Sequence, residues 1–418
     1  MRLKLEKCHR VILIRHGQST YNALGLYQGS SDEPVLTEVG RSDARLTGTY
    51  LKGLAFDAIY SSSLKRAHET AKEILAAIAP DVDPKTILVT DKLRETDLPA
   101  WQGLAFQHVR ETFPKEYRRW KQRPHEFCME IPQKRAGAQR GRGAEERLYS
   151  FPRHIYPALD LYQRVQQFWQ EVLPRHVGQN LLLVTHGGTN RALISTALGI
   201  TPDRYHCIQQ SNCGISVLNF TDGSLESGRL EAMNLSAHVG EHLPKLQEGG
   251  KGLRLLLVPL SATVQQTQNL AELLKEVNID FCLTGVLDSS HVMAQQILKY
   301  HPETVQLEVL REDFPEAWQA VITTKSRVCN SLVTGLVTAK EDSIKRLICQ
   351  AISLNPDQSE RLQVQAGTIS CIQYPGYHHP PILQAMNISA TQNNLDLIYK
   401  ANLESVESVQ SVGCVNAV

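Results

Sequence analysis

The chain has 418 residues, 42% hydrophobic and 21% charged, which is enough for two to three domains with ordinary cores. Its 44 Lys and Arg residues nearly balance its 43 Asp and Glu residues, so we expect neither a nucleic-acid-coating protein nor a membrane-surface binder. Apolar runs such as Val11–Ile14 are far shorter than the roughly 20 residues that a membrane-spanning helix needs.

The N-terminal residues and the cysteines lead to the same expectation about the location of the protein. Residues 1–7 include an acid and no long apolar stretch, so they do not resemble a signal peptide. The nine cysteines are dispersed without a C-x-x-C pair, which is typical of reduced thiols and disfavours a zinc site. We therefore expect a cytoplasmic protein with no bound metal.

Short apolar runs alternate with segments of helical period along the first half of the chain. In chain order, strands are expected at Val11–Ile14, Ala58–Tyr60, Ile87–Val89 and Leu181–Val184, and helices at Leu64–Ile78 and Leu161–Val172. The serines at 61–63 are expected to cap the first of these helices, with Arg66 in its first turns. Alternating strands and helices predict an α/β sandwich.

A basic insert interrupts this pattern between about residues 104 and 157. We expect a helical excursion in its first part and a surface loop at the Gly/Arg run of residues 136–143. Its arginines form either a solvated face or a lid that attracts an anionic substrate.

The Gly-rich break at residues 247–252 separates the first half from a second half that repeats it. Leu230–Ala237 and Leu383–Ala390 are identical at six of eight positions, and Phe56–Leu75 pairs without gaps with Ile279–Leu298. A further pair of matches joins residues 93–102 to residues 310–319 in the same chain order. We therefore predict an internal duplication, with domains at residues 1–246 and 253–418.

Polar residues that suit phosphate chemistry follow the predicted strands. Arg15, His16 and Gly17 come directly after the first strand, where α/β sheets usually bind ligands. An Arg offers a fork for phosphate, and a His offers a nucleophilic nitrogen. Arg66 lies near a helix start, and Glu95 follows another strand. The strand–His–Gly pattern returns at His186 and Gly187.

In combination, these motifs resemble the histidine phosphatase superfamily, which has the phosphoglycerate-mutase-like fold. The matching segments are Leu13–Gly17, Gln28-Gly29, Leu36–Gly40, Ser63–Ala67, Leu93–Glu95 and Val184–Gly187. The resemblance implies a three-layer α/β/α sandwich, duplicated here, and an enzyme that needs neither cofactor nor metal.

The resemblance also implies roles for individual residues. His16 would become phosphohistidine, and Glu95 would act as general acid and then as general base. The phosphate-binding residues would be Arg15, Asn22, Arg66, His186 and Gly187, and the substrate-binding residues would be Gln28 and Gly29. Two arginines and a protonated histidine would stabilise the charge of the transition state.

The second half lacks this set. In the sequence pairing, Arg15, His16, Arg66 and His186 fall on Val258, Pro259, Ser289 and Ala339, and only the acid is kept, as Glu312. We predict a degenerate, catalytically inactive second domain. The pair His378-His379 is interpreted as a loop feature and not as a metal site.

The sequence leaves the substrate open. Residues 15–22, 28–37 and 210–218 are similar to the 2-carboxy-D-arabinitol-1-phosphate phosphatase group, which implies a small phosphorylated metabolite as substrate. A phosphoserine phosphatase is the alternative. A phosphoglycerate mutase is disfavoured by Gln18, where mutases usually carry Glu, and a non-catalytic metabolite-binding protein is disfavoured by the intact first half. Stabilisation, completion of the active site and homodimer formation are open roles for the second half.

Overall fold

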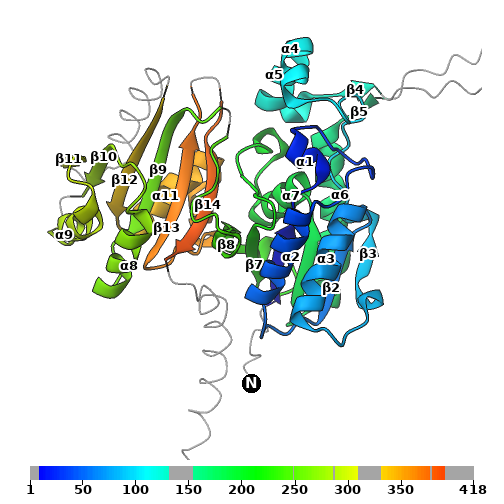
Figure 1. Cartoon of the computed structure of the whole chain (residues 1–418), viewed down its shortest axis with the longest axis horizontal. Helices are drawn as coiled ribbons and strands as arrows, with labels where there is room; N and C mark the ends of the chain where they lie inside the picture. The colour runs from blue at the N-terminus through cyan, green and yellow to red at the C-terminus, as the bar shows by residue number, and fades with distance from the viewer. Residues whose placement is uncertain are drawn as a thin grey trace, which may run out of the picture.

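A single 12-stranded sheet runs through the molecule in the computed structural model, which describes residues 9–130, 154–247, 249–285, 288–308, 331–376 and 379–390 (Figure 1). The strand order is β11-β10-β12-β9-β13-β14-β8-β7-β1-β6-β2-β3. The first half supplies β1 (His9–Arg15), β2 (Ala58–Ser62), β3 (Leu88–Thr90), β6 (Asn180–Thr185), β7 (Ile215–Phe220) and β8 (Arg229–Leu235). The second half supplies β9 (Gly252–Pro259), β10 (Phe281–Thr284), β11 (Val305–Glu308), β12 (Leu332–Ala339), β13 (Thr368–Tyr374) and β14 (Ile382–Ser389).

Helices cover both faces of the sheet. The first half has α1 (Thr20–Leu24), α2 (Glu38–Tyr50), α3 (Lys65–Ile78), α4 (Phe106–Thr112), α5 (Pro114–Gln122), α6 (Pro157–Val172) and α7 (Gly187–Leu198). The second half has α8 (Val264–Leu274), α9 (Asp288–Ile297) and α11 (Glu341–Ile352). The 3-10 turns are Pro84–Thr86, Asp91–Leu93, Pro124–Glu126, Leu173–Arg175, Pro202–Arg204, Leu225–Ser227, Ala237–Val239, Leu298–Tyr300 and Pro356–Arg361. No helix in the described ranges is long and apolar enough to cross a membrane.

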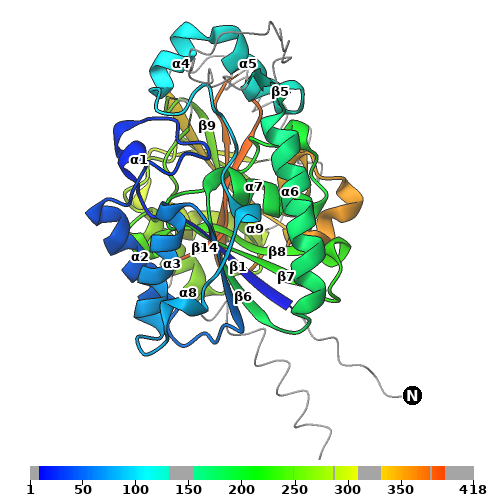
Figure 2. The same cartoon turned by 90° about the vertical axis from the view of Figure 1, so that its right-hand side faces the viewer.

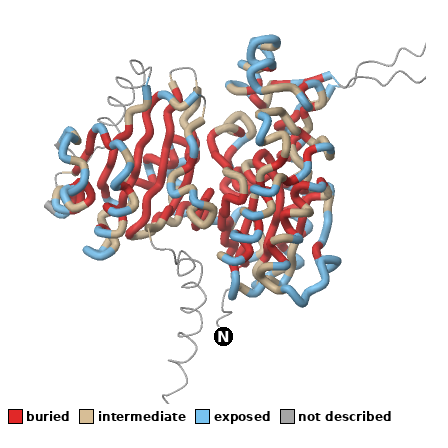
Figure 3. The backbone as a smooth tube through the Cα atoms, in the orientation of Figure 1, coloured by how far each residue is buried: buried red, intermediate tan, exposed pale blue. Residues whose placement is uncertain are grey.

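The alternation of side chains along β1 explains the layers. Val11 and Leu13 join a core cluster with residues of α6 and α7, whereas Ile12 and Ile14 join a second cluster with residues of α2 and α3. A strand buried on both faces reads as a continuous apolar run, as the sequence of β1 does. Both clusters extend into the second half, and Figure 3 shows buried residues along the strands of both halves. The predicted α/β/α sandwich is confirmed.

The two halves have the same strand order, reversed about the β8–β14 junction. β8-β7-β1-β6-β2-β3 in the first half corresponds to β14-β13-β9-β12-β10-β11 in the second. β8 and β14 are antiparallel and pair at Met233 and Met386. Asn234 donates its side-chain amide to the Gln384 carbonyl at 2.7 Å, and Asn387 donates to the Glu231 carbonyl at 2.6 Å. The junction therefore has an approximate two-fold symmetry.

Strand register corrects the sequence pairing of the two halves at His16. The His16 amide donates to the Thr185 carbonyl at 2.8 Å, and the Leu260 amide donates to the Ala339 carbonyl at 3.0 Å. The structure thus equates His16 with Leu260, one residue beyond the expected Pro259. The apolar run of β9 contains no feature that fixes register, so the sequence alone is ambiguous here.

The same shift applies to the neighbouring strand. His186 is the N-cap of α7, and Lys340 is the N-cap of α11, so Lys340 and not Ala339 corresponds to His186. Arg15 pairs with Thr185 as Pro259 pairs with Ala339, which places Pro259 at the position of Arg15.

Two details of the first half bear on the site. The predicted serine cap of α3 is wrong, because its N-cap is Leu64, and Asp32 from a distant loop accepts from the Lys65 amide at 2.6 Å. Ser63 instead donates to Asp91. The predicted helical excursion is confirmed as α4 and α5, which stand above the sheet near the two-stranded ribbon β4 (Met129–Glu130) and β5 (His154–Ile155) (Figure 2). The Gly/Arg run at 136–143 lies outside the described residues.

Candidate active site

The predicted site residues meet at the carboxyl ends of β1 and β6. These parallel strands are neighbours, and β1 pairs on its other side with the antiparallel β7. Arg15 ends β1 and His16 follows it, while His186 follows β6 and precedes α7. This edge of an α/β sheet is where ligands are usually bound.

His16 is held in one orientation and one tautomer. Its side chain is nearly buried, and Nδ1 lies 2.7 Å from the Gly17 carbonyl oxygen. Because a carbonyl only accepts, Nδ1 carries the proton and Nε2 keeps its lone pair. Burial, and then the charges of Arg66 and Arg15, hold the pKa of His16 well below its usual 6.5. The imidazole is therefore neutral and nucleophilic near neutral pH.

Arg15 and Arg66 are fixed beside His16 by backbone carbonyls. Arg15 Nη1 donates to Gln210 O at 2.7 Å, and Arg66 donates from Nη1 to Ser31 O at 2.7 Å and from Nη2 to Gly29 O at 2.9 Å. Burial lowers the pKa of each guanidinium to about 10, so both remain charged at neutral pH. The pair supplies two positive charges that need no rearrangement to meet an anion.

His186 lies behind His16. The two ring centroids are 5.2 Å apart with an edge-to-face geometry, and His186 Nε2 is 2.8 Å from Ser62 Oγ. The ring is fully buried, and its Nδ1 has no hydrogen-bond partner among the described residues. Burial, followed by the charge of Arg66, keeps the pKa of His186 well below its usual value. The ring is therefore neutral in the structure, in contrast to the protonated state that the sequence analysis expects.

Glu95 is oriented by the start of α7. Its Oε1 accepts from the Thr96 amide at 2.7 Å, and its Oε2 accepts from the Gly188 amide at 2.9 Å. Arg164 donates to the Glu95 backbone carbonyl at 3.1 Å. A Cβ on Gly188 would lie 2.3 Å from Oε1 and 2.2 Å from the Tyr205 hydroxyl, so only glycine fits there. The carboxylate is thus fixed at a helix N-terminus, where negative charge is stabilised.

The segment after His16 forms another wall. Asn212 Nδ2 donates to the His16 carbonyl at 2.9 Å and to Asn22 Oδ1 at 3.2 Å, and Ser19 Oγ donates to Gln28 Oε1 at 2.8 Å. Gly29 has a φ of +51°, and a Cβ there would lie 3.0 Å from the Gln102 side chain. This turn presents the Gly29 carbonyl to Arg66.

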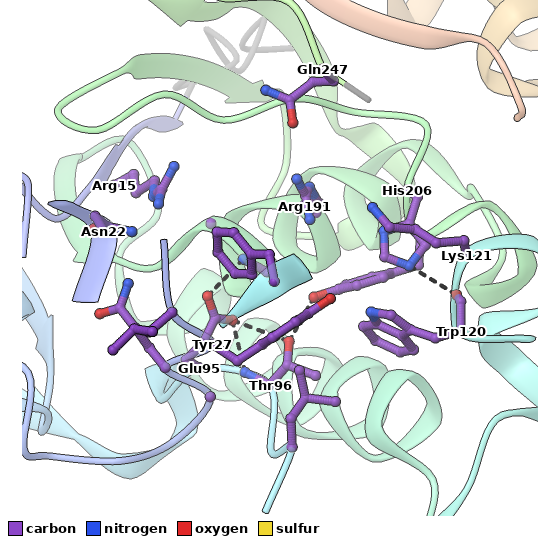
Figure 4. A pocket seen from close by; sticks show the side chains of 18 of the residues that line it. Arg15, Asn22, Tyr27, Glu95, Thr96, Trp120, Lys121, Arg191, His206 and Gln247 are labelled. Carbon is purple, nitrogen blue, oxygen red and sulfur yellow. Dashed lines mark hydrogen bonds between the residues drawn. The ribbon is translucent and has the colours of Figure 1, made fainter. Parts of the chain in front are cut away.

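Most of the predicted site residues line one cavity of about 380 Å³ (Figure 4). Eight of the nine predicted site residues line it, and His186 does not, because it is packed behind His16. The described residues that line the cavity beyond the predicted set are Leu26, Tyr27, Thr96, Leu98, Phe106, Arg110, Tyr117, Trp120, Lys121, Gly188, Arg191, Tyr205, His206, Gln247 and Gly249.

For some of these additional residues, a position close to a predicted site residue in the sequence indicated a place in the cavity. Thr96 directly follows Glu95, and Arg191 is one helical turn beyond Gly187. Tyr205, whose hydroxyl is 2.6 Å from Thr96 Oγ1, comes from a segment without such a signal. In the part of the chain that the structure describes, no group of three or more His, Cys, Asp or Glu side chains has the arrangement of a metal site.

Comparison with known proteins assigns the family. The sequence model of the histidine phosphatase superfamily (branch 1) matches residues 11–150 and 128–234, which together span more than half of the 418 residues. The chain belongs to the histidine phosphatase superfamily. Both matched ranges lie in the first half, which supplies all the residues that line the cavity except Gln247 and Gly249.

Several similar proteins are phosphatases by name, and others are phosphoglycerate mutases. The chain is 36% identical over 217 residues to the 2-carboxy-D-arabinitol-1-phosphatase of Triticum aestivum, covering 52% of this chain and 38% of that protein. It is 30% identical over 232 residues to phosphoserine phosphatase 1 of Hydrogenobacter thermophilus, covering 56% of this chain and 95% of that protein. The solved structure of a mycobacterial glucosyl-3-phosphoglycerate phosphatase is 23% identical with a TM-score of 0.43, covering 54% of this chain and 99% of that one. The match to the wheat relative thus spans only 38% of that protein's length.

Proposed function

We propose that this chain is a metal-independent phosphomonoester phosphatase that works through a phosphohistidine on His16. One observation carries the proposal: the unprotonated Nε2 of His16 shares a cavity with Arg15, Arg66 and Glu95. A nucleophile, two fixed cations and one carboxylate are the groups that a two-step phosphoryl transfer requires.

In the first step, His16 Nε2 attacks phosphorus and the bond from phosphorus to the alcohol oxygen breaks. Arg15 and Arg66 stabilise the equatorial oxygens. The proposed role of His186 is to support this charge from behind His16, since its ring packs edge to face on the His16 ring. Glu95, in its acid form, gives its proton to the leaving alcohol. The products of this step are the free alcohol and phosphohistidine.

In the second step, Glu95 acts as a carboxylate. It takes a proton from water while the water oxygen attacks phosphorus and the N–P bond breaks. Inorganic phosphate leaves, and both His16 and the acid form of Glu95 are restored.

For the substrate, we propose a small phosphorylated hydroxy acid or sugar acid such as 2-carboxy-D-arabinitol 1-phosphate. The wheat relative supports this choice, as do the cations Lys121 and Arg191 on the cavity wall, which suit an acidic substrate. L-phosphoserine is the second candidate, favoured by the match over nearly the whole length of a phosphoserine phosphatase.

We further propose two domains, at residues 1–246 and 253–418, of which the second is catalytically inactive. Leu260 and Lys340 stand where His16 and His186 stand in the first half, so a nucleophile and a phosphate-pocket histidine are both missing there. Glu312 lies outside the described residues. The cytoplasmic location and a homodimer stay predictions; the free thiols of the described cysteines Cys128, Cys207, Cys213, Cys282, Cys349 and Cys371 support the first.

The mechanism is tested by replacing the nucleophile. We expect His16→Ala to lower kcat by at least about 10³-fold and to prevent labelling by a phosphorylated substrate, because no other side chain can form the intermediate. The matched control is His242→Ala, an exposed histidine away from the cavity. Vanadate should inhibit the enzyme and EDTA should not. Full activity of His16→Ala would exclude the mechanism, and faster exchange of 2- and 3-phosphoglycerate than release of phosphate would indicate a mutase.

A further inference from the structure

The catalytic cavity continues toward the second half of the chain. Arg191, His206 and Gln247 line both this cavity and a smaller one that also touches His379 and Ile382 of the second half. A third cavity, of about 670 Å³, lies beside α5 and again includes His379. Lys121 lines all three, so the cavities adjoin one another around its side chain.

The walls of this extended cleft are strongly cationic. Among the described residues that line the three cavities, Glu95 at the inner end is the only carboxylate. Its outer parts carry the cations Arg110, Arg118, Lys121 and Arg191. Figure 4 shows Arg191 between Arg15 and Lys121, with Lys121 on the far side beside His206. An excess of positive charge this far from the phosphate pocket suits a second anionic group.

The second half also holds the inner part of this wall in place. Arg191 Nε donates to the Ile208 carbonyl at 2.7 Å. Ile208 forms a bridge with Leu383 of β14, and the Gln209 amide donates to the Leu383 carbonyl at 2.9 Å. β14 therefore fixes the segment that orients Arg191, and the loop before β14 brings His379 to the cleft.

We propose that Lys121 of the first half and His379 of the second form an outer anion subsite, so that the inactive second half contributes directly to substrate binding. The substrate would carry an additional anionic group, a carboxylate or a second phosphate, at the end remote from the scissile phosphate. This inference rests on the proposed function for the inner phosphate site, but it concerns a separate contact and is tested by binding.

The test measures affinity without turnover in the full chain that carries His16→Ala. Calorimetry gives the dissociation constants of inorganic phosphate, 3-phosphoglycerate and 2,3-bisphosphoglycerate. The ratio of the constant for inorganic phosphate to that for each larger ligand measures how much the additional anionic group contributes to binding. We expect Lys121→Gln and His379→Ala each to reduce the preference for the two larger ligands over inorganic phosphate by about tenfold, because each removes one hydrogen-bond donor to a charged group. A loss for both larger ligands, which share a carboxylate, would identify the group as a carboxylate, and a loss confined to 2,3-bisphosphoglycerate would identify it as a phosphate.

Lys115→Gln is the matched control, since Lys115 is exposed on α5 and lines none of the three cavities. Unchanged ratios in Lys121→Gln would overturn the subsite. A change in Lys121→Gln with none in His379→Ala would overturn the contribution of the second half. Because the readout is binding, a protein that proves unable to hydrolyse phosphomonoesters would refute the proposed function and leave this test intact.

Discussion

Neutral histidines beside buried arginines are the feature that most constrains the chemistry of individual residues. His16 and His186 lie edge to face within the field of Arg15 and Arg66, and burial lowers the pKa of both imidazoles. A neutral His16 is what a nucleophile requires. When a phosphate dianion binds, its negative charge opposes that of the arginines and favours a proton on His186. Substrate binding and protonation of His186 are therefore expected to be coupled.

These two histidines predict a loss of stability in acid. Above pH 6.5 the imidazoles are neutral in the folded and the unfolded chain, so they add no pH dependence. Below that pH the unfolded chain binds protons and the folded chain does not, so each histidine lowers the free energy of unfolding by about 1.4 kcal/mol per pH unit. Urea unfolding at about pH 7.5, 6.0 and 5.0 measures this slope. The free energy of unfolding of His16→Ala should fall less steeply with decreasing pH, by about 1.4 kcal/mol per pH unit, which corresponds to one proton. Equal slopes for the two proteins would show that His16 titrates normally when folded.

At the scale of elements, the β8–β14 junction depends on two asparagines in left-handed conformation. Asn234 has a φ of 56° and Asn387 a φ of 63°, values that few residues other than glycine adopt. Each turns its amide across the junction to a carbonyl of the other half. The repeated Met-Asn pair in the sequence is thus explained by a repeated structural requirement.

Replacing Asn387 tests this account. Its side chain also donates to the Gln363 carbonyl and accepts from the Gln365 amide, both of which would lose a buried partner. We expect Asn387→Ala to lower the free energy of unfolding by about 3 kcal/mol. Asn387→Gly, which tolerates a positive φ, should be about 1 kcal/mol less damaging. The urea midpoints of the two variants measure the difference, and equal midpoints would show that backbone strain has no part in it.

Most of the helices and strands were predictable from the sequence. The apolar runs of β1 and β6 and the periodicity of α3 and α6 are local signals, and the structure confirms them to within a few residues. The prediction of a serine cap for α3 was wrong because the Lys65 amide donates to Asp32, which comes from a loop that is distant in sequence. The predicted register of β9 was wrong because its apolar run Leu255–Val258 contains nothing that distinguishes neighbouring positions.

For the whole molecule, the second half covers an edge of the first. β8 pairs with β14, and Leu230, Met233 and Leu235 of β8 are buried. An uncovered strand edge of this kind is a template for pairing with another chain. We therefore expect the second half to stabilise the first and to keep this edge from pairing with another chain, besides its proposed contact with substrate.

A chain that ends at Gln247 tests that role. We expect it to self-associate through β8, because the edge and its apolar residues become exposed, and to lose at least about tenfold in kcat/KM because the Gln209–Gln210 segment that binds Arg15 loses its support. Light scattering during gel filtration and a phosphatase assay measure the two effects. A monomeric truncated chain with full activity would show that the first half is independent of the second.

The sequence by itself determined the duplication, the alternation of strands and helices, and the identity of the chemical groups at the strand ends. Those features are local, because they depend on residue type and spacing within one segment. Only the tertiary structure decided that His186 lies behind His16, that Gly188 and Thr96 fix Glu95, and that His379 reaches the same cleft as Lys121. These relations join residues distant in sequence, and their physical basis is the pairing of β8 with β14, which brings two similar halves into one sheet.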